Sequence, residues 1–436
     1  MVDLRTALIV SPYFPPSTVA GVHRARHLAK HLPDAGWKPV IMCVDERYHV
    51  ERLDPALAQL LPHELETIKV RAIPEGLTRV AGFGDISIRA WPYLRRAMKQ
   101  ILTRRKIDVV LITGAPFYPM LLGRMIREQF KRPLVLDFQD PWVWKFSPND
   151  RRWSKMGLSH LLARNLEPIA LRSASYITSV SDVQNEEMAA RYPWLNSKAM
   201  AGIPIGGDPD DFSTLRTVFD EDATDDLEPG KINVSYVGTF LPTADSVFSA
   251  LFRGFRKLRD ETPQLADRIR LKFFGTSNNS NDKTSFRARS LAAAQGVADA
   301  VNEVPERLPY LRSLGILARS HALLLLGSSE PHYTASKIYP ALMSKRPYLS
   351  IYHRASSSHA ILSAAGGGRA LAFAGADELA SLEQPIAEAL RTLVLNPDSV
   401  GAANPIHYAP YEAKSIAKRY ADIFDSIVKR APAYDA

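Results

Sequence analysis

The sequence predicts an α/β protein built from two doubly wound domains. Short apolar runs alternate with helical patterns along the whole chain, and the runs lack the polar alternation of half-exposed strands. An acidic cluster that ends in Pro229-Gly230 divides the chain into halves of similar length. The chain has 436 residues, of which 46% are hydrophobic and 23% charged, as is ordinary for a globular protein with more than one core.

Each half contains the elements of a parallel sheet covered by helices. In the first half we expect strands at 7–10, 39–44, 70–73, 108–113, 134–138 and 176–180, with helices at 23–32 and 118–130. In the second half we expect strands at 233–238, 270–275, 322–327, 348–352 and 370–374. The resulting domains are an N-terminal domain at 1–212, an acidic linker at 213–230, a C-terminal domain at 231–410, and a helix with a tail at 411–436.

Composition excludes several classes of protein. The single cysteine, Cys43, rules out a disulfide framework and a multi-cysteine zinc site. The longest apolar runs are far too short to span a bilayer, and the first residues lack the pattern of a secretory signal, so we expect a cytoplasmic protein. The net charge of +9 favours ligands that carry phosphate, but it does not choose among nucleic acid, nucleotide and anionic lipid. Nucleic acid is the least favoured, because no recognition helix or stacking platform is evident.

The first half offers candidate site residues at the ends of predicted strands. Gly21 stands between the loop after the first strand and a helix, a position that suits an anionic ligand. Asp137 and Asp140 end another strand and would orient hydroxyls or act as a base, although Asp140 would also serve as a cap on the turn before Pro141. The histidines at 23, 27 and 31 share one helix face, but the apolar residues of that helix place them toward solvent, so we expect no metal site.

Two further segments are basic. Ser336 can cap a helix and Lys337 adds a positive charge beside it, which suits a phosphate. No acidic residue lies between Asp85 and Asp108, and this stretch contains the basic residues Arg89, Arg95, Arg96, Lys99, Arg104, Arg105 and Lys106. Such a basic amphipathic helix fits an anionic membrane surface, through Arg95, Arg96, Arg104 and Arg105, and equally fits an ordinary solvated helix.

Several segments together resemble the family 4 glycosyltransferases. They are Ser11-Pro12-Tyr13-Phe14-Pro15-Pro16 followed by Gly21 and Arg24, Gly114-Ala115-Pro116-Phe117, Leu136-Asp137-Phe138-Gln139-Asp140-Pro141-Trp142, residues 203–212, Tyr236-Val237-Gly238-Thr239-Phe240, and Ala335-Ser336-Lys337-Ile338-Tyr339. The segments cover nearly the whole chain in the order expected for an uncharacterised branch of that family.

The resemblance implies the GT-B fold, in which two Rossmann-like domains face each other across a cleft and the C-terminal helix packs back on the N-terminal domain. It implies a UDP- or GDP-sugar as substrate, no cofactor, no metal, and usually retention of anomeric configuration. The donor would contact Gly21, Arg24, Gly238, Thr239, Ser336, Lys337 and Ile338, and Asp137 and Asp140 would be catalytic. The acceptor would be a glycan or a lipid-linked sugar at the inner face of the plasma membrane, as in bacterial polysaccharide assembly.

The chain also departs from the family pattern. The two glutamates of the donor helix are replaced by His332 and Pro340, and Gln139 stands where an arginine is expected. These changes favour a second hypothesis, a catalytically inactive GT-B module that acts as a partner subunit. A third hypothesis, a GT-B sugar-nucleotide epimerase, has less support because the sequence offers no convincing acid/base set.

Overall fold

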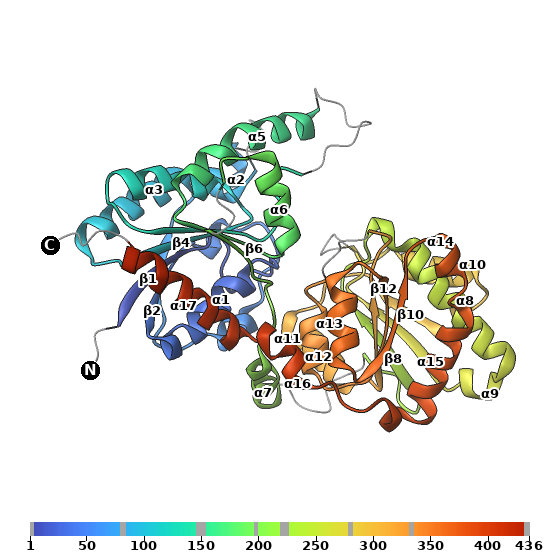
Figure 1. The fold of residues 1–436 in the computed structure, drawn as a ribbon. Helices are drawn as coiled ribbons and strands as arrows, with labels where there is room; N and C mark the ends of the chain where they lie inside the picture. The colour runs from blue at the N-terminus through green and yellow to red at the C-terminus, as the bar shows by residue number, and fades with distance from the viewer. Residues whose placement is uncertain are drawn as a thin grey trace. The chain divides into compact units, whose positions relative to one another are not determined.

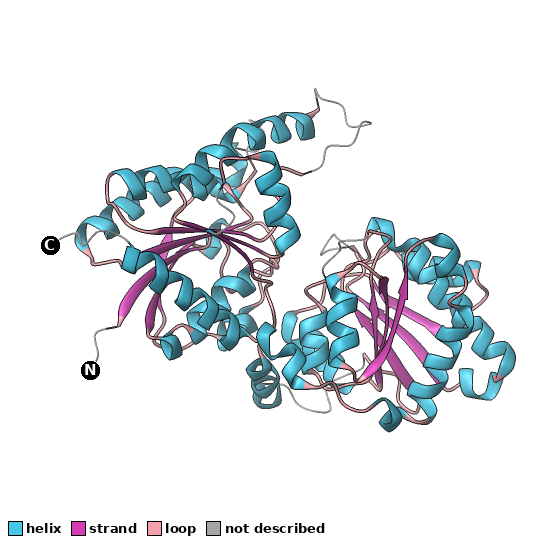
Figure 2. Ribbon diagram, in the orientation of Figure 1, coloured by secondary structure: helices cyan, strands magenta, loops and turns pink. Residues whose placement is uncertain are grey.

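The computed structural model describes residues 4–78, 84–144, 154–195, 199–218, 226–277, 282–330 and 335–430 (Figure 1). The chain forms two compact units. The first combines the residues up to Ile205 with those from Ala413 onward, and the second is Gly206–Glu412. Each unit has a parallel sheet with helices on both of its faces (Figure 2). Residues 219–225 of the expected linker, His332 of the donor helix, and the tail at 431–436 lie outside the described residues.

The sheet of the first unit has seven parallel strands in the order β3-β2-β1-β4-β5-β6-β7. The strands are β1 (Arg5–Val10), β2 (Trp37–Val44), β3 (Glu66–Val70), β4 (Val109–Gly114), β5 (Leu134–Phe138), β6 (Tyr176–Ser179) and β7 (Met200–Gly202). The chain runs outward from β1 in one direction and then returns to add β4 on the other side. The carboxyl ends of β1 and β4 therefore form the topological switch point, where open α/β sheets bind ligands.

Two helical layers cover this sheet. One face packs against α3 (Ile86–Arg104), α4 (Gly123–Glu128), α5 (Lys155–Ser173) and α6 (Asp182–Arg191). The short helix α2 (Glu75–Thr78) comes between β3 and α3 in the chain. The other face packs against α1 (Val22–His31) and α17 (Ala413–Arg430). The expected return of the C-terminal helix to the N-terminal domain is confirmed, because α17 contacts α1 directly.

The structure corrects the placement of two α1 histidines. His27 and His31 are buried and not directed to solvent, and the His27 Nδ1 lies 3.3 Å from the Ile205 carbonyl. The His27 ring also contacts Arg26, at 2.9 Å from Nε2. These side chains are therefore part of the packing of α1.

The sheet of the second unit has six parallel strands in the order β10-β9-β8-β11-β12-β13. The strands are β8 (Ile232–Val237), β9 (Ile269–Phe274), β10 (Val301–Val304), β11 (Ala322–Leu326), β12 (Tyr348–His353) and β13 (Gly368–Phe373). Its switch point lies between β8 and β11. The helices are α7 (Pro209–Val218), α8 (Asp245–Glu261), α9 (Pro263–Ala266), α10 (Arg287–Ala294), α11 (Tyr310–Arg319), α12 (Ile338–Met343), α13 (Ser357–Ala365), α14 (Ala376–Ala380), α15 (Glu383–Leu395) and α16 (Pro405–Tyr408).

Part of the expected acidic linker belongs to the second unit. Helix α7 includes residues 213–218, which we had expected to be linker. Asp226 accepts two hydrogen bonds from Arg312 of α11, at 2.8 and 2.7 Å, and is mostly buried. Asp226, near the end of the expected linker, thus pairs with a helix of its own unit.

Differences from the sequence prediction gather at sheet edges. The interior strands lie within one or two residues of their expected positions, whereas β3 begins at Glu66 and the predicted strand began at residue 70. The strands β7 and β10 were not predicted. All three are edge strands. An edge strand has a neighbouring strand on one side only and is less enclosed, so its sequence needs no continuous apolar run. None of the described helices is both long enough and apolar enough to cross a membrane.

Candidate functional site

The switch point of the second sheet brings Gly238 and Lys337 together. Gly238 follows β8, and Lys337 stands between β11 and α12. A Cβ atom added to Gly238 would lie 3.1 Å from Lys337 Cδ, so the lysine stem passes directly over the glycine. Gly238 also has a φ of 143°, which residues with side chains rarely adopt. The glycine therefore serves both the turn after β8 and the approach of Lys337.

The Lys337 amine rests on Tyr236, the residue two positions before Gly238. Its Nζ lies 4.1 Å from the centre of the Tyr236 ring and donates a hydrogen bond to the Tyr236 hydroxyl. The hydroxyl in turn donates to the Thr239 carbonyl at 2.8 Å. Among the described residues, no carboxylate pairs with Lys337. Part of the side chain reaches the surface, but burial of the amine among protein atoms lowers the pKa of Lys337 to about 7.

This arrangement suits an anion. A desolvated amine without a counter-charge gains its protonated form when a negative group approaches. The amine is held at the switch point by an aromatic face and a hydroxyl that cannot neutralise it. A phosphate is a common biological group that would neutralise the protonated amine.

Two of the backbone amides expected to face this anion are already engaged. The Gly238 amide donates to the Phe274 carbonyl of β9 at 2.9 Å, so Gly238 offers space and not a donor. The Ile338 amide donates to the Ala335 carbonyl at 3.2 Å, and the Ile338 side chain is fully buried. These two expectations are corrected. The half-buried Thr239 and the exposed Ser336 remain candidates for contact.

Pro340 and Glu330 lie near the donor helix, where the family pattern has two glutamates. Pro340 lies within α12. Its side chain has no hydrogen-bonding group, so the residue offers only its backbone carbonyl as an acceptor. Glu330, after β11, accepts a hydrogen bond from the Thr243 hydroxyl at 3.3 Å. Glu330 thus contacts the loop between β8 and α8, at the same edge of the sheet as Lys337.

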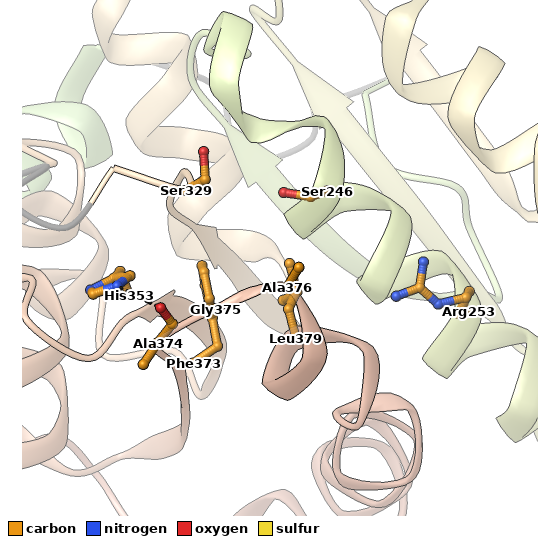
Figure 3. Close-up of a pocket in the computed structure, with 9 residues that line it drawn as sticks. All are labelled: Ser246, Arg253, Ser329, His353, Phe373, Ala374, Gly375, Ala376 and Leu379. Carbon is orange, nitrogen blue, oxygen red and sulfur yellow. Dashed lines mark hydrogen bonds between the residues drawn. The ribbon is translucent and has the colours of Figure 1, made fainter.

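A pocket of about 190 Å³ opens at the carboxyl ends of β11, β12 and β13 (Figure 3). Ser246 of α8 and Ser329 lie on one side, and His353 and Phe373 lie on another. Both His353 ring nitrogens are occupied, Nε2 by the Ala374 carbonyl at 3.2 Å and Nδ1 by the Ala355 amide at 3.1 Å. The imidazole is therefore a fixed wall of the pocket and not an available base.

In the first unit, Asp137 is a buried structural group. Its oxygens accept hydrogen bonds from Thr113 at 2.9 Å, from Thr178 at 2.9 Å and from Tyr420 of α17 at 2.7 Å. It also pairs with Arg24 at 3.2 Å, and both of these side chains are fully buried. The expectation that Asp137 is catalytic is therefore wrong for this structure, because no substrate can reach a carboxylate enclosed by four partners.

Arg24 is likewise structural and not a donor contact. Its Nη1 donates to the Pro204 carbonyl at 2.8 Å, and its Nη2 donates to the Ile203 carbonyl. Its guanidinium carbon lies 5.2 Å from the centre of the Tyr420 ring. Arg24 joins α1, β5 and α17, and its charge is already compensated by Asp137.

Asp140 keeps the features of a functional carboxylate. Asp140 follows β5 at the carboxyl edge of the first sheet and is exposed to solvent. Loss of solvation around the carboxyl raises the pKa of Asp140. A carboxylate that is reachable and has a raised pKa suits proton transfer better than the buried Asp137 does.

Gln139 lies between these aspartates and contacts Gly21. Its Nε2 donates to the Gly21 carbonyl at 3.2 Å and to the Thr113 hydroxyl. Because that hydroxyl already donates to Asp137, it must accept from the amide, and this fixes the amide orientation. A Cβ on Gly21 would lie 3.2 Å from Gln139 Oε1, so Gly21 is needed for this close approach.

The comparisons with known proteins agree with this architecture. Residues 20–198 match the family model described as "Glycosyl transferase 4-like domain". The HepE protein of Anabaena, solved with UDP and glucose, superposes with a TM-score of 0.58 at 15% identity, over 97% of this chain and 100% of that chain. Sucrose-phosphate synthase of Thermosynechococcus elongatus gives 0.59 at 15% identity, over 98% and 100% of the two chains.

The fold is GT-B. A third GT-B structure, WaaG, a glycosyltransferase involved in lipopolysaccharide biosynthesis, gives a TM-score of 0.54 at 14% identity, over 98% of this chain and 100% of that chain. A search of curated proteins found no match in sequence. The Lys337 site lies in the GT-B unit that the family model does not reach, since the matched residues end at 198.

Two residues of these sites, Tyr236 and Gln139, are not singled out by the sequence patterns. Tyr236 stands within one of the resembling segments, in β8 and two positions before the glycine that follows this strand. Gln139 was noted only as a departure from the family. An aromatic residue two positions before a glycine at a strand end was the signal available for Tyr236.

Proposed function

We propose that this chain is a glycosyltransferase that moves a sugar from a UDP- or GDP-sugar to a glycan or a lipid-linked acceptor. The second unit would bind the donor and the first the acceptor, in bacterial polysaccharide or glycolipid assembly at the cytoplasmic face of the plasma membrane. Retention of anomeric configuration and independence of metal are part of the proposal and rest on the family resemblance.

The Lys337 site carries the proposal. Transfer from a nucleotide-sugar places negative charge on the leaving diphosphate, and a positive group fixed in advance stabilises that charge. Lys337 supplies an amine at the switch point of the second sheet, and the Tyr236 hydroxyl that it contacts donates to the Thr239 carbonyl. The HepE structures with UDP and with UDP-glucose support the choice of ligand.

Asp140 is the residue we propose for proton transfer or for orientation of the acceptor hydroxyl. It is exposed at the carboxyl edge of the first sheet, and its pKa is raised by loss of solvation. Asp137 is not proposed, because its hydrogen bonds and its burial assign it to the core.

A second candidate is an inactive GT-B module that acts as a partner subunit. Pro340 favours it, because this residue replaces a donor-helix glutamate and cannot contact a ribose through a side-chain oxygen. Thermal melting with UDP, GDP and their sugars tests whether the chain binds a nucleotide at all. A ligand at 100 times its Kd adds about 2.7 kcal/mol of stability to the folded chain.

Melting should then be followed by a turnover measurement. The sugar-nucleotide that stabilises the chain is incubated with it, and release of the free nucleotide is measured, with and without EDTA. Stabilisation together with nucleotide release supports the transferase. Stabilisation without release, also in the presence of glycan and lipid-linked acceptors, favours the inactive module, and the absence of any shift removes the donor site.

A further inference from the structure

The start of α1 offers two backbone donors at the switch point of the first sheet. Gly21 is the residue before α1, and the first two amides of the helix already donate to carbonyls of the preceding loop. The amides of Ala20 and Gly21 have no hydrogen-bond partner in the part of the chain that the structure describes. Ala20 is exposed and Gly21 is half-buried, so a ligand can approach both amides. Free amides at a helix start would, by themselves, suit water or an anion.

Gln139 brings an unpaired acceptor to the same place. Only 7% of this residue is exposed, and its Oε1 accepts no hydrogen bond from any described residue. Its Nε2 donates to the Gly21 carbonyl and to the Thr113 hydroxyl, so the amide group cannot turn over and present its nitrogen instead. A buried acceptor without a partner is unfavourable, and a donor from outside the chain would relieve that cost.

The unpaired oxygen borders the space that a side chain on Gly21 would occupy. A Cβ atom placed on Gly21 would lie 3.2 Å from Gln139 Oε1 and 3.5 Å from the Ala115 carbonyl oxygen. Two oxygen acceptors from the ends of β4 and β5 therefore meet at one small space beside the start of α1. A group that enters this space has to donate a hydrogen bond.

The charges around this space disfavour an anion. Asp140 follows Gln139 and is an exposed carboxylate. Arg24 is fully buried in α1, where Asp137 compensates its charge. A phosphate would bring more oxygen acceptors toward Oε1 and toward Asp140, which is unfavourable. A hydroxyl group can donate to an oxygen and accept from an amide at the same time. The space therefore suits a hydroxyl group better than the anion expected from the sequence.

We infer that the acceptor of the proposed transfer is a neutral sugar that places one hydroxyl group between Gly21 and Gln139. Gln139 Oε1 accepts the hydroxyl hydrogen, and a free amide of Ala20 or Gly21 donates to the hydroxyl oxygen. Gln139 is then a specificity-determining residue, because its fixed acceptor favours a hydroxyl over a phosphate. The inference rests on the proposed function, since it names the chemistry of the acceptor, but all of its residues belong to the first unit.

Saturation-transfer NMR with neutral methyl glycosides, in the absence of nucleotide, tests the inference. The probes are the methyl glycosides of glucose, galactose and N-acetylglucosamine. The chain carries Lys337→Ala, so that phosphate cannot bind at the Lys337 site. At least one glycoside should bind, and inorganic phosphate in large excess should not displace it.

Gly21→Ala tests the position of the sugar. Gly21 has a φ of −59°, which alanine adopts freely, and the added Cβ fills the space without removing a hydrogen bond. The variant should bind the glycoside at least about tenfold more weakly, because the hydroxyl can no longer reach Oε1. Gly76→Ala is the matched control, since no atom lies within 4 Å of its added Cβ, and should bind like the parent chain.

A series of deoxy glycosides identifies the hydroxyl and does not depend on the variant. Removal of one particular hydroxyl should weaken binding to the parent chain about tenfold, and should have no further effect in Gly21→Ala. The inference is overturned if no neutral glycoside binds, if phosphate displaces the glycoside, or if every deoxy glycoside binds the parent chain equally well. Failure of the proposed function gives a different result, in which no sugar-nucleotide stabilises the chain or is consumed while glycoside binding is unaffected.

Discussion

The Lys337 amine lies 4.1 Å from the centre of the Tyr236 ring and donates a hydrogen bond to the Tyr236 hydroxyl. The two residues come from segments about a hundred positions apart and meet at the switch point of the second sheet. The pair holds an amine at a sheet edge, against an aromatic ring and with no carboxylate partner among the described residues. Five predictions rest on this pair, on the buried network around Asp137, and on the exposed Asp140.

Lys337→Ala should weaken binding of the stabilising sugar-nucleotide by about 10-fold to 100-fold. A hydrogen bond to a charged group contributes about 1.5–3 kcal/mol, and the substitution removes both the charge and the donor. Isothermal titration calorimetry measures the change. Lys257→Ala on the outer side of α8 is the control and should bind like the parent chain. Equal binding by the Lys337 variant and the control would contradict the site.

Sugar-nucleotide binding should weaken as the pH rises through about 7. The pKa of Lys337 is lowered to about 7, so above that pH binding of the diphosphate requires uptake of a proton, and the Kd should rise toward tenfold per pH unit. A sugar-nucleotide is the right probe because it lacks the phosphate monoester group that titrates near pH 6. Lys337→Ala should give a flatter pH profile between pH 6 and 9.

The same group has the opposite effect on folding. An unfolded chain holds the proton of this lysine up to about pH 10.4, whereas the folded chain releases it near pH 7. The contribution of Lys337 to stability therefore rises with pH across that window. Nucleotide affinity and unliganded stability should change in opposite directions, which a general loss of structure at high pH would not produce.

Asp137→Ala should destabilise the first unit by about 3–5 kcal/mol. Removing the carboxylate leaves the fully buried Arg24 charge uncompensated and frees the hydroxyls of Thr113, Thr178 and Tyr420 from their shared acceptor. Urea unfolding followed by circular dichroism measures the loss. Asp140→Ala, three positions away and exposed, should change stability by no more than about 0.5 kcal/mol. A reversed order of the two variants would refute the structural role of Asp137.

Asp140→Asn should lower turnover by about 100-fold or more while leaving sugar-nucleotide affinity unchanged. A positioned acid or base contributes about 100-fold to 10,000-fold to a rate, and the amide cannot transfer the proton. Nucleotide release from the sugar-nucleotide is the measurement. Unchanged release in Asp140→Asn would mean that the acid/base group lies elsewhere in the chain.

The sequence alone determined the fold and the interior of both sheets. Strands buried on both faces require long apolar runs, so the runs at Leu134–Phe138 and Ala322–Leu326 were recognisable without coordinates. The edge strands β3, β7 and β10 carry weaker patterns, because they are only partly enclosed. Their positions depend on pairing with a neighbour, which a local pattern does not contain.

Only the tertiary structure decided which charged residues are available to a ligand. Asp137 and Asp140 belong to one motif, yet burial under α17 makes the first a structural group and leaves the second exposed. Arg24 and Lys337 were both expected to contact phosphate. Arg24 is neutralised by a carboxylate distant in sequence, whereas Lys337 rests on a tyrosine that carries no charge to neutralise it. The physical reason is that solvation and counter-charge depend on contacts between segments far apart in the chain, which residue type and local spacing do not specify.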